Sequence, residues 1–569
     1  MTYRHFKHEG WLYVLAFLAA VALRFIQLGA VPLSDIEAAP ALQALHIAQG
    51  LKPALSPHPF YILFTSIFFF LYGGGTDFLA RLIPALIGSL LVFAPLLFTE
   101  RIKPRPSLFL AFFIALDPGL ISLSRQAASP ILAITFLLFA WGFFNQKRLN
   151  LAGIFAALAL LSGPSIWLGI LGLGITWAIL QGINYRRAPQ PSTDDLSSFF
   201  FHAKSSFFLP LLITFITVGT LFFIVPNGIS AALASIPAFF SGWVSASDVF
   251  ASRLLISLAV YQLLGVILAL MAIIRGWRNG SPRIISLSVW FLVALLLVVF
   301  IPSRQIADLA WALIPLWAMA SLELVRSVDV FPEERNEVLG VVFLTAFLWA
   351  FTWLDLSGMV WNPVDSSQYS LRFWLLIGAV FLFVLSLLLV AAGWSIRVAR
   401  IGGVWGLALV LGLFSFGGAL GAAGFRGLAN PELWWSPSIP MQADLLQATV
   451  RDISEWSVGD DFSAPVVIAG LDSPALEWAL RQHQVTVVDA LDISSSPDFV
   501  ITPFENDPVL VAAYRGQDFS WRQTPSWNVT LPNDWVRWVA LREMPQTGET
   551  IILWARDDLF IDVPTQPIP

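Results

Sequence analysis

The sequence predicts a polytopic α-helical membrane protein with a soluble α/β domain at its C-terminal end. Apolar residues make up 57% of the 569-residue chain and charged residues only 12%, with a mean hydropathy of +0.75. An ordinary soluble domain has about 25% charged residues. The apolar residues form runs long enough to cross a bilayer, and these runs stop near residue 422.

The charge distribution separates the two parts of the chain. Residues 424–569 contain 20 acidic residues and 8 arginines, a net charge of −12, so the rest of the chain carries +7. So acidic a segment is a poor ligand for nucleic acid or anionic lipid headgroups, and we expect no nucleic-acid partner. The chain has no cysteine, which excludes disulfides, thiolate metal sites and cysteine nucleophiles.

About thirteen transmembrane helices are predicted in residues 1–422. A helix that crosses a hydrocarbon layer of about 30 Å needs about 20 apolar residues. The first run, from Trp11, is too long for a signal peptide and predicts an anchored span. The runs cover residues 11–29, 78–98, 107–123, 130–145, 149–163, 165–182, 207–226, 253–274, 284–301, 305–323, 338–356, 371–392 and 402–422.

The orientation depends on one short apolar run, Phe60 to Tyr72. It has about 13 residues, which favours an interfacial position over a crossing. If it does not cross, most cationic loops fall on one side of the membrane, among them those with Arg101, Lys103 and Arg283. The positive-inside rule then predicts a cytoplasmic N-terminus, an outer loop at residues 30–77 and an extracytoplasmic C-terminal domain.

Residues 423–569 have the pattern of a small α/β domain. Apolar residues recur at helical spacing between Leu445 and Trp456, and Ser473-Pro474 is typical of a helix start. Only Gly470 follows the first strand, which excludes a dinucleotide-binding fingerprint there. The predicted strands are Val466–Ala469, Val485–Asp489, Phe499–Thr502, Trp535–Leu541 and Ile551–Ala555.

Two carboxylates at the start of the outer loop are candidates for catalysis. Asp35 and Glu37 precede a short helix-like stretch, Ala38 to Gln49. Ser34-x-x-Glu37 fits a capping box, in which both side chains satisfy free backbone amides. The same position would hold the carboxylates at the membrane surface, where one of them could accept a proton from an attacking hydroxyl. Both interpretations stay open.

Two arginines lie on the side where the charge rule disfavours them. Arg125 and Arg304 could snorkel toward lipid headgroups. Alternatively, they could clamp a lipid-linked phosphate, since a planar, permanently charged fork suits its oxygens. The isolated histidines, His58 among them, have no spacing that suggests a metal cluster. No cofactor is certain, although a divalent metal remains compatible with the sequence.

The sequence resembles the GT-C superfamily, specifically the protein O-mannosyltransferase and aminoarabinose-transferase type. The likeness is best in the first half, and also includes the order of spans and the outer C-terminal domain. Arg24 lies near the end of the first span. The motifs are "PLSDIEAAPALQALHIAQG", "HPFY" with His58, "DFLARLIPALIGSL" with Arg81, and "LDPGLISLSRQAASP" with Arg125.

This resemblance implies a glycosyltransferase that moves a sugar from a polyprenyl-phosphate donor to an acceptor at the outer membrane face. Asp35 and Glu37 would be catalytic, and Arg125, Arg304, Arg81 and His58 would bind substrate. The acceptor could be a glycan, lipid or protein. The sequence departs from the family at two acids, since Ile36 replaces the usual aspartate beside Glu37 and Ser129 replaces one in the next outer turn.

Two other functions remain. A non-catalytic relative, acting in the assembly of envelope polysaccharide, would use Asp35 and Glu37 only to cap a helix. A transporter or flippase is less favoured, because such proteins often have paired broken helices and Ser162-Gly163-Pro164 has no counterpart. The enzyme hypothesis expects Asp35, Glu37, Arg125 and Arg304 to line one cavity.

Overall fold

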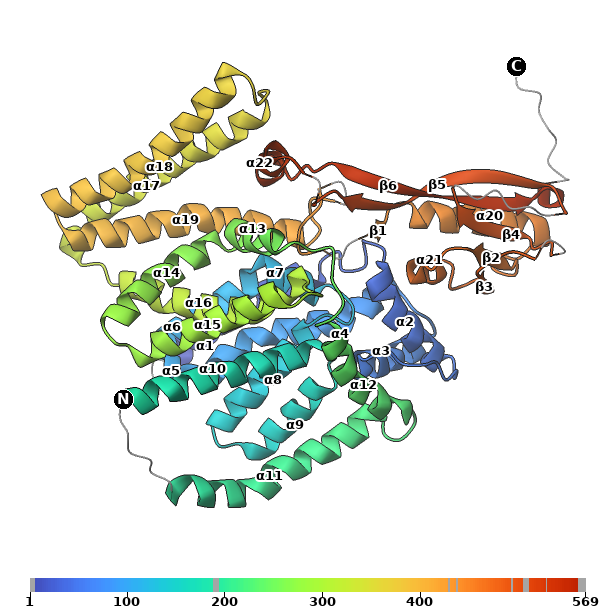
Figure 1. Ribbon diagram of the computed structural model, residues 1–569, viewed down its shortest axis with the longest axis horizontal. Coiled ribbons are helices and arrows are strands. Elements are labelled where there is room, and N and C mark those ends of the chain that lie inside the picture. Colours follow the sequence, from blue (N-terminus) through green and yellow to red (C-terminus); the bar gives the residue numbers. More distant parts are fainter. Residues whose placement is uncertain are drawn as a thin grey trace.

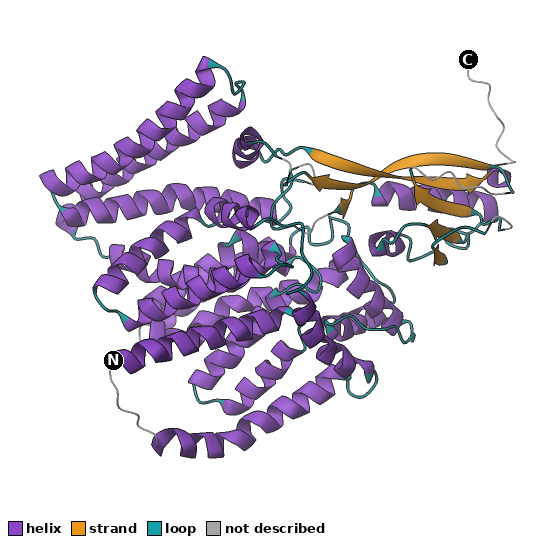
Figure 2. Ribbon diagram, viewed as in Figure 1, coloured by secondary structure: helices purple, strands orange, loops and turns teal. Residues whose placement is uncertain are grey.

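The computed structural model describes residues 6–187, 194–427, 430–435, 438–492, 495–504, 511–528 and 530–560. Helices fill the chain up to Ala422, and the strands are confined to the C-terminal part (Figure 2). The C-terminal domain lies against one end of the helical domain (Figure 1). The predicted class, an α-helical membrane protein with a C-terminal sheet domain, is therefore confirmed.

The helical domain begins with α1 and the two short helices of the loop that follows it. Its first half consists of α1 (Phe6–Phe25), α2 (Asp35–Ala48), α3 (Pro59–Tyr72), α4 (Asp77–Leu90), the 3-10 helix η1 (Leu91–Phe98), α5 (Thr99–Ile102), α6 (Pro104–Leu116), α7 (Pro118–Ser124), α8 (Ile131–Asn145), α9 (Leu149–Leu160) and α10 (Ser165–Arg187). Its second half consists of α11 (Asp194–Gly219), α12 (Asn227–Ser241), α13 (Ala251–Tyr261), α14 (Leu263–Arg278), α15 (Pro282–Phe300), η2 (Ile306–Leu309), α16 (Ala310–Leu324), η3 (Val325–Ser327), η4 (Pro332–Glu334), α17 (Arg335–Val360), α18 (Ser367–Gly393) and α19 (Ile396–Ala422).

The structure does not confirm the number of thirteen spans. Among the described residues, seven helices are long and apolar enough to cross a membrane. Two bent helix pairs would raise this number to nine if each pair is one span. Shorter apolar helices, including α3, α8 and α9, account for other predicted runs. The hydropathy pattern located the helices, but helix length alone does not decide which of them cross.

At both bends, polar groups are hydrogen-bonded within the protein, as a hydrocarbon environment requires. α6 and α7 meet at 58° and α13 and α14 at 91°. Asp117 lies at the first bend, where its carboxylate accepts hydrogen bonds from Leu120 N at 2.8 Å and Trp317 Nε1 at 2.8 Å. Gln262, at the second bend, donates to the same carboxylate at 3.1 Å. One buried carboxylate therefore links the two broken helices.

The C-terminal domain is built on one six-stranded mixed sheet. Its strand order is β1-β5-β6-β4-β2-β3, with β2 parallel to both β3 and β4 and the remaining pairs antiparallel. The elements are β1 (Ile439–Pro440), α20 (Ala443–Val458), β2 (Val466–Ala469), α21 (Pro474–Ala479), β3 (Val485–Val488), β4 (Phe499–Pro503), β5 (Tyr514–Pro525), α22 (Pro532–Leu541), β6 (Gln546–Arg556) and η5 (Asp557–Phe560).

One predicted strand is wrong, and two strands, β1 and β5, were not predicted. Trp535–Leu541 lies in helix α22, which begins with Pro532 at its first turn. Asp534 caps this helix, because its carboxylate accepts a hydrogen bond from Leu531 N at 2.9 Å. β5 escaped prediction because most of its side chains are polar and only two of them are buried.

α22 connects β5 to β6 and contacts the membrane domain. Its Trp538 is fully buried and donates a hydrogen bond to the Pro431 carbonyl at 2.9 Å. Nearby, the buried Glu432 accepts a short hydrogen bond from Tyr261 of α13 and pairs with Arg426 at 3.2 Å. Burial raises the pKa of Glu432, an effect that Arg542 opposes. The linker and the C-terminal domain are thus fixed onto the broken α13–α14 pair.

Candidate active site

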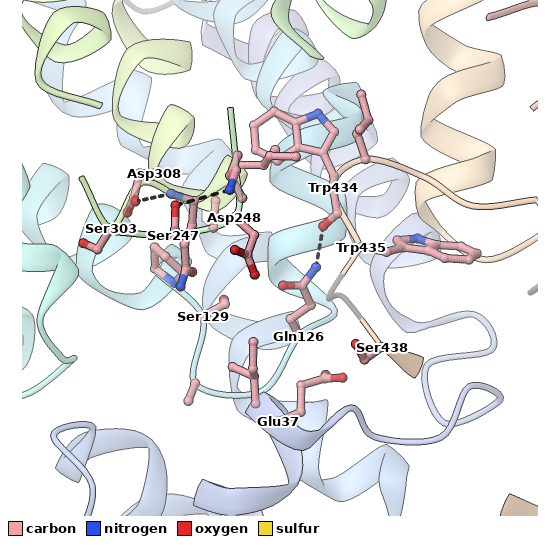
Figure 3. Close-up of a pocket in the computed structure, with 18 of the residues that line it drawn as sticks. Glu37, Gln126, Ser129, Ser247, Asp248, Ser303, Asp308, Trp434, Trp435 and Ser438 are labelled. Atoms are coloured by element: carbon pink, nitrogen blue, oxygen red, sulfur yellow. Dashed lines mark hydrogen bonds between the residues drawn. The ribbon is translucent and has the colours of Figure 1, made fainter. Parts of the chain in front are cut away.

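A large cavity lies where the helical domain meets the C-terminal domain (Figure 3). Its volume is about 1030 Å³. Its walls include the start of α2, the loop that ends at the N-cap of α3, the loop that follows α7 and the α9–α10 break. The other walls come from the segments around residues 238–253 and 301–308, the linker 431–441 and residues 523–528 at the end of β5. The C-terminal domain therefore closes part of this cavity.

Glu37 lines the cavity, but other residues already engage its carboxylate. Arg81 donates from Nε to Oε1 and from Nη2 to Oε2, both at 2.8 Å. Ser34 N donates to Oε2 at 3.2 Å and Ala127 N to Oε1 at 3.1 Å. Burial alone would raise the pKa of Glu37, but Arg81 and these amides lower it. Glu37 is a charged acceptor that holds three segments of chain together.

Asp35 lies outside the cavity lining and binds the C-terminal domain. Its Oδ1 accepts hydrogen bonds from Ser473 Oγ at 2.7 Å and Ala475 N at 3.1 Å, which places it at the start of α21. Its Oδ2 pairs with Arg522 of β5 at 2.6 Å. Asp35 and Glu37 thus diverge, because residues two apart in the first turn of α2 point to opposite faces of the helix, one toward the C-terminal domain and the other toward the membrane domain.

We expect Asp35→Ala to loosen the C-terminal domain. The substitution removes an ion pair that is mostly buried and two hydrogen bonds to a charged acceptor, which contribute about 1.5–3 kcal/mol each at most. Limited proteolysis of the purified protein should cut the linker between residues 423 and 442 several-fold faster. The matched control is Glu549→Ala, which removes the exposed partner of the same Arg522. Equal cleavage rates in both variants would contradict this docking function for Asp35.

The three predicted substrate-binding arginines donate hydrogen bonds to backbone carbonyls. Arg125 donates to the carbonyls of residues 23, 24, 26 and 27 at 2.8–3.2 Å, and so closes the end of α1. Arg81 donates to the carbonyls of residues 28, 31 and 32 in addition to Glu37. Together with Glu37 they line a separate hollow of about 40 Å³. Arg304 donates to Ile301 O at 3.1 Å and Val249 O at 3.5 Å, beside the large cavity.

His58 reaches the large cavity as the N-cap of α3. Its ring packs on Gly163, where a Cβ atom would come within 2.4 Å of the imidazole. Gly163 has a φ of +119°, so glycine is required there on two grounds. Burial lowers the pKa of His58 to about 4, and the imidazole is therefore neutral near pH 7. The Ser162-Gly163-Pro164 break thus packs against the loop that connects α2 to α3.

The structure therefore separates the six residues that the sequence singled out. Glu37 and His58 line the large cavity, whereas Asp35, Arg81, Arg125 and Arg304 do not. The expectation that Asp35, Glu37, Arg125 and Arg304 line one cavity is not met. Sequence spacing could not reveal this, because the partners of these side chains lie up to several hundred residues away.

Asp248 provides a carboxylate without a partner in the cavity. Its loop is fixed by Asn528, which donates to the Asp248 carbonyl at 2.6 Å, and by Ser247 Oγ, which donates to the Arg304 carbonyl at 2.7 Å. Figure 3 shows the Asp248 carboxylate pointing into the open space near Gln126 and Ser129. Among the described residues, none donates a hydrogen bond to this carboxylate or pairs with it. No sequence pattern distinguishes Asp248 from the other acidic residues near the ends of the predicted spans.

Arg253 is the one cation among the described residues that line the cavity. It lies in the first turn of α13, where the helix dipole disfavours a positive charge. Its guanidinium lies 5.2 Å from the ring centre of Trp527, and its Nε is buried without a hydrogen-bond partner. No carboxylate pairs with it in the part of the chain that the structure describes. Sequence analysis missed Arg253, although a cation at the outer end of a predicted span was a usable signal.

The remaining wall of the cavity combines polar side chains with aromatic rings. It presents hydroxyl and amide groups together with two indoles, Trp434 and Trp435, on the linker. Gln126 Nε2 holds the linker through the Trp434 carbonyl at 2.6 Å, and Gly119 lets the Trp434 ring approach closely. The Trp434 Nε1 is buried without a partner. Within the described ranges, no three acidic or histidine side chains come together as a metal site would require.

Comparisons with known proteins identify the fold. No family model matches the chain, and no curated protein matches it in sequence. Among solved structures, ArnT from Cupriavidus metallidurans bound to undecaprenyl phosphate is similar, with a TM-score of 0.53 and 14% identity over 87% of this chain and 93% of that one. ArnT in the apo state gives a TM-score of 0.54 over 88% and 94%. The chain therefore has the fold of the GT-C membrane glycosyltransferases.

Proposed function

We propose that this protein is a glycosyltransferase that moves a sugar from a polyprenyl-phosphate donor to an acceptor hydroxyl in the large cavity. One observation carries the proposal. The described lining contains a carboxylate, Asp248, and a guanidinium, Arg253, and neither has an ion-pair partner. Arg253 is partly buried and its Nε has no partner, which is costly unless a ligand uses the charge, whereas Asp248 is exposed and its carboxylate is free to meet an acceptor. The GT-C fold supports this interpretation, since ArnT itself is known bound to undecaprenyl phosphate.

In the proposed reaction, Asp248 accepts the proton of the acceptor hydroxyl as its oxygen attacks C1 of the sugar. The C1–O bond to phosphate breaks, and its electron pair stays on the leaving polyprenyl phosphate. Arg253 offsets the negative charge that develops on this phosphate. Glu37 and Arg81 take no proton in this scheme, and instead fix the loop that forms one wall.

The cavity lies at the extracytoplasmic face in this proposal. The C-terminal part of the chain next to it, residues 424–569, has a net charge of −12, whereas Arg101, Arg275 and Arg283 lie at the opposite end of the helices. This distribution favours a cytoplasmic N-terminus. Trp434 and Trp435 are typical of the headgroup layer, where a lipid-linked sugar would enter.

The proposal is tested with purified protein in nanodiscs and a panel of undecaprenyl-phosphate-linked sugars. We expect release of undecaprenyl phosphate with at least one donor, and Asp248→Asn should lower this rate about 10²–10⁴-fold while undecaprenyl phosphate still binds. The matched control is Asp308→Asn, which also lines the cavity and can still cap Gln305 N through its amide oxygen. A turnover in Asp248→Asn equal to that of the control would exclude Asp248 as the base.

A second function, a non-catalytic carrier-binding protein, has one specific observation in its favour. Asp35 and Glu37 are both engaged in holding the fold together, as a relative that had lost the reaction would allow. This alternative expects undecaprenyl phosphate to bind through Arg253 and no donor of the panel to be turned over. The same experiment therefore separates the two functions.

A further inference from the structure

A second cavity lies at the end of the membrane domain remote from the C-terminal domain. Its volume is about 900 Å³. Its walls come from parts of α8, α10, α15 and α16, together with η1, α5 and α6 and single residues of α9 and α11, and α5 marks the end that lies away from the C-terminal domain (Figure 1). The lining is almost wholly apolar and includes Leu138, Trp141, Leu173, Trp177 and Trp290.

The two cavities are separated along α10. Ser165 and Leu168 line the first cavity, and Leu173, the next α10 residue to line either, belongs to the second. Between them Trp311 of α16 packs on Gly169 so closely that a Cβ atom there would lie 2.3 Å from its ring. Trp311 is 4% exposed, and its Nε1 donates to Ser165 Oγ at 3.0 Å. A ligand of the second cavity must therefore enter from the membrane or from the remote end.

The rim of this cavity carries two arginines without ion pairs. Arg101, at the end of α5, donates to Asn145 Oδ1 at 2.8 Å, and Arg283 is exposed at the start of α15. Neither has a carboxylate partner among the described residues. Glu100 is the one acidic residue of the described rim, which leaves a net charge of +1. An apolar pocket that ends at cations matches a lipid with an anionic headgroup, and the single net charge matches one phosphodiester.

We propose that the second cavity seats one phospholipid with a singly charged phosphodiester headgroup, from the leaflet remote from the C-terminal domain. One acyl chain fills the space between α8, α10 and α15, because an apolar cavity in a membrane protein stays dry and gains by filling with hydrocarbon. The phosphate lies between Arg101 and Arg283. The bound lipid contacts the helix surfaces that line the cavity and that no other helix covers.

Native mass spectrometry of the protein, reconstituted in equal amounts of phosphatidylglycerol and phosphatidylcholine, tests this site. We expect one retained phosphatidylglycerol, and an Arg101→Gln/Arg283→Gln variant should retain it about 30-fold less, given about 1 kcal/mol for each of the two surface cations. The control is Arg278→Gln, an exposed arginine at the same end that does not line the cavity. Both arginines of the variant are exposed, so the fold is expected to persist.

Other outcomes overturn the proposal. Retention of phosphatidylcholine at the level of phosphatidylglycerol would show that the rim arginines select no headgroup. Added undecaprenyl phosphate that displaces the phospholipid would assign the cavity to the donor's tail instead. The readout is the mass of bound lipid and not sugar transfer, so this inference and the proposed function can fail independently.

Discussion

Glu37→Gln is expected to destabilise the protein by about 3–5 kcal/mol, because it leaves Arg81 as an uncompensated buried charge. The side chains of Glu37 and Arg81 are 3% and 6% exposed, and two charge-assisted hydrogen bonds join them. A glutamine oxygen could replace one carboxylate oxygen, but its amide group would face a donor of Arg81 or Ala127. Thermal or denaturant unfolding in detergent measures this loss, which is large beside a typical stability of about 5–15 kcal/mol.

The pH dependence of the same variant gives an independent check. Arg81 keeps the folded-state pKa of Glu37 below that of a free glutamate despite burial. The contribution of Glu37 to the free energy of unfolding is therefore complete above the unfolded-state pKa of about 4.3. It is lost only as the pH falls through the lower folded-state pKa. The stability difference between wild type and Glu37→Gln should be full at pH 7 and shrink at acid pH. A variant as stable as wild type at pH 7, but inactive, would instead restore Glu37 as a catalytic residue.

A double-mutant cycle separates the ion pair from the rest of this region. Arg81→Met alone leaves the Glu37 carboxylate buried, and both substitutions together remove both charges. We expect the double variant to be more stable than the sum of the two single losses predicts, since the charges are coupled. Additive losses would mean that Arg81 acts mainly through the carbonyls that it also binds.

Local patterns in the sequence predicted what local physics determines. Ser34-x-x-Glu37 indicated a capped helix start, and α2 begins at Asp35 with Glu37 accepting from Ser34 N. The apolar runs located the helices because lipid forces backbone hydrogen bonds to close within each segment. The bends at Asp117 and Gln262 were beyond this approach, since they depend on a hydrogen bond between residues far apart in the chain.

The contents of the cavity could not be predicted for the same reason. Asp35 and Glu37 are two positions apart, yet their partners, Arg522 and Arg81, belong to different domains. In the sequence, Arg125 has the features of a phosphate clamp. Its guanidinium in fact binds carbonyls at the end of α1, and no residue near Arg125 in the sequence indicates these contacts. In the C-terminal domain, Trp535 and its neighbours indicated a strand, although a helix lets Trp535 and Trp538 pack around Trp527. In each case, the deciding contact is long-range.

Arg253→Gln is expected to lower kcat/KM for the lipid-linked donor by about 10²–10³-fold, the effect of removing one preorganised donor from a developing oxyanion. Its charge is the one cation of the described cavity lining, and Trp527 holds its guanidinium in place from 5.2 Å. Undecaprenyl phosphate binding should weaken in parallel, because the phosphate carries charge in both ground and transition states. Asp248→Asn should instead lower kcat with donor binding retained.

The comparison with neighbouring arginines makes this prediction specific. Arg253→Lys should recover only part of the activity, since an ammonium group keeps the charge but lacks the planar fork. Arg304→Gln should have a smaller effect, because that side chain binds the carbonyls of Ile301 and Val249 beside the cavity. Undiminished binding of undecaprenyl phosphate to Arg253→Gln, with a loss in Arg304→Gln, would move the phosphate site to the 301–305 loop.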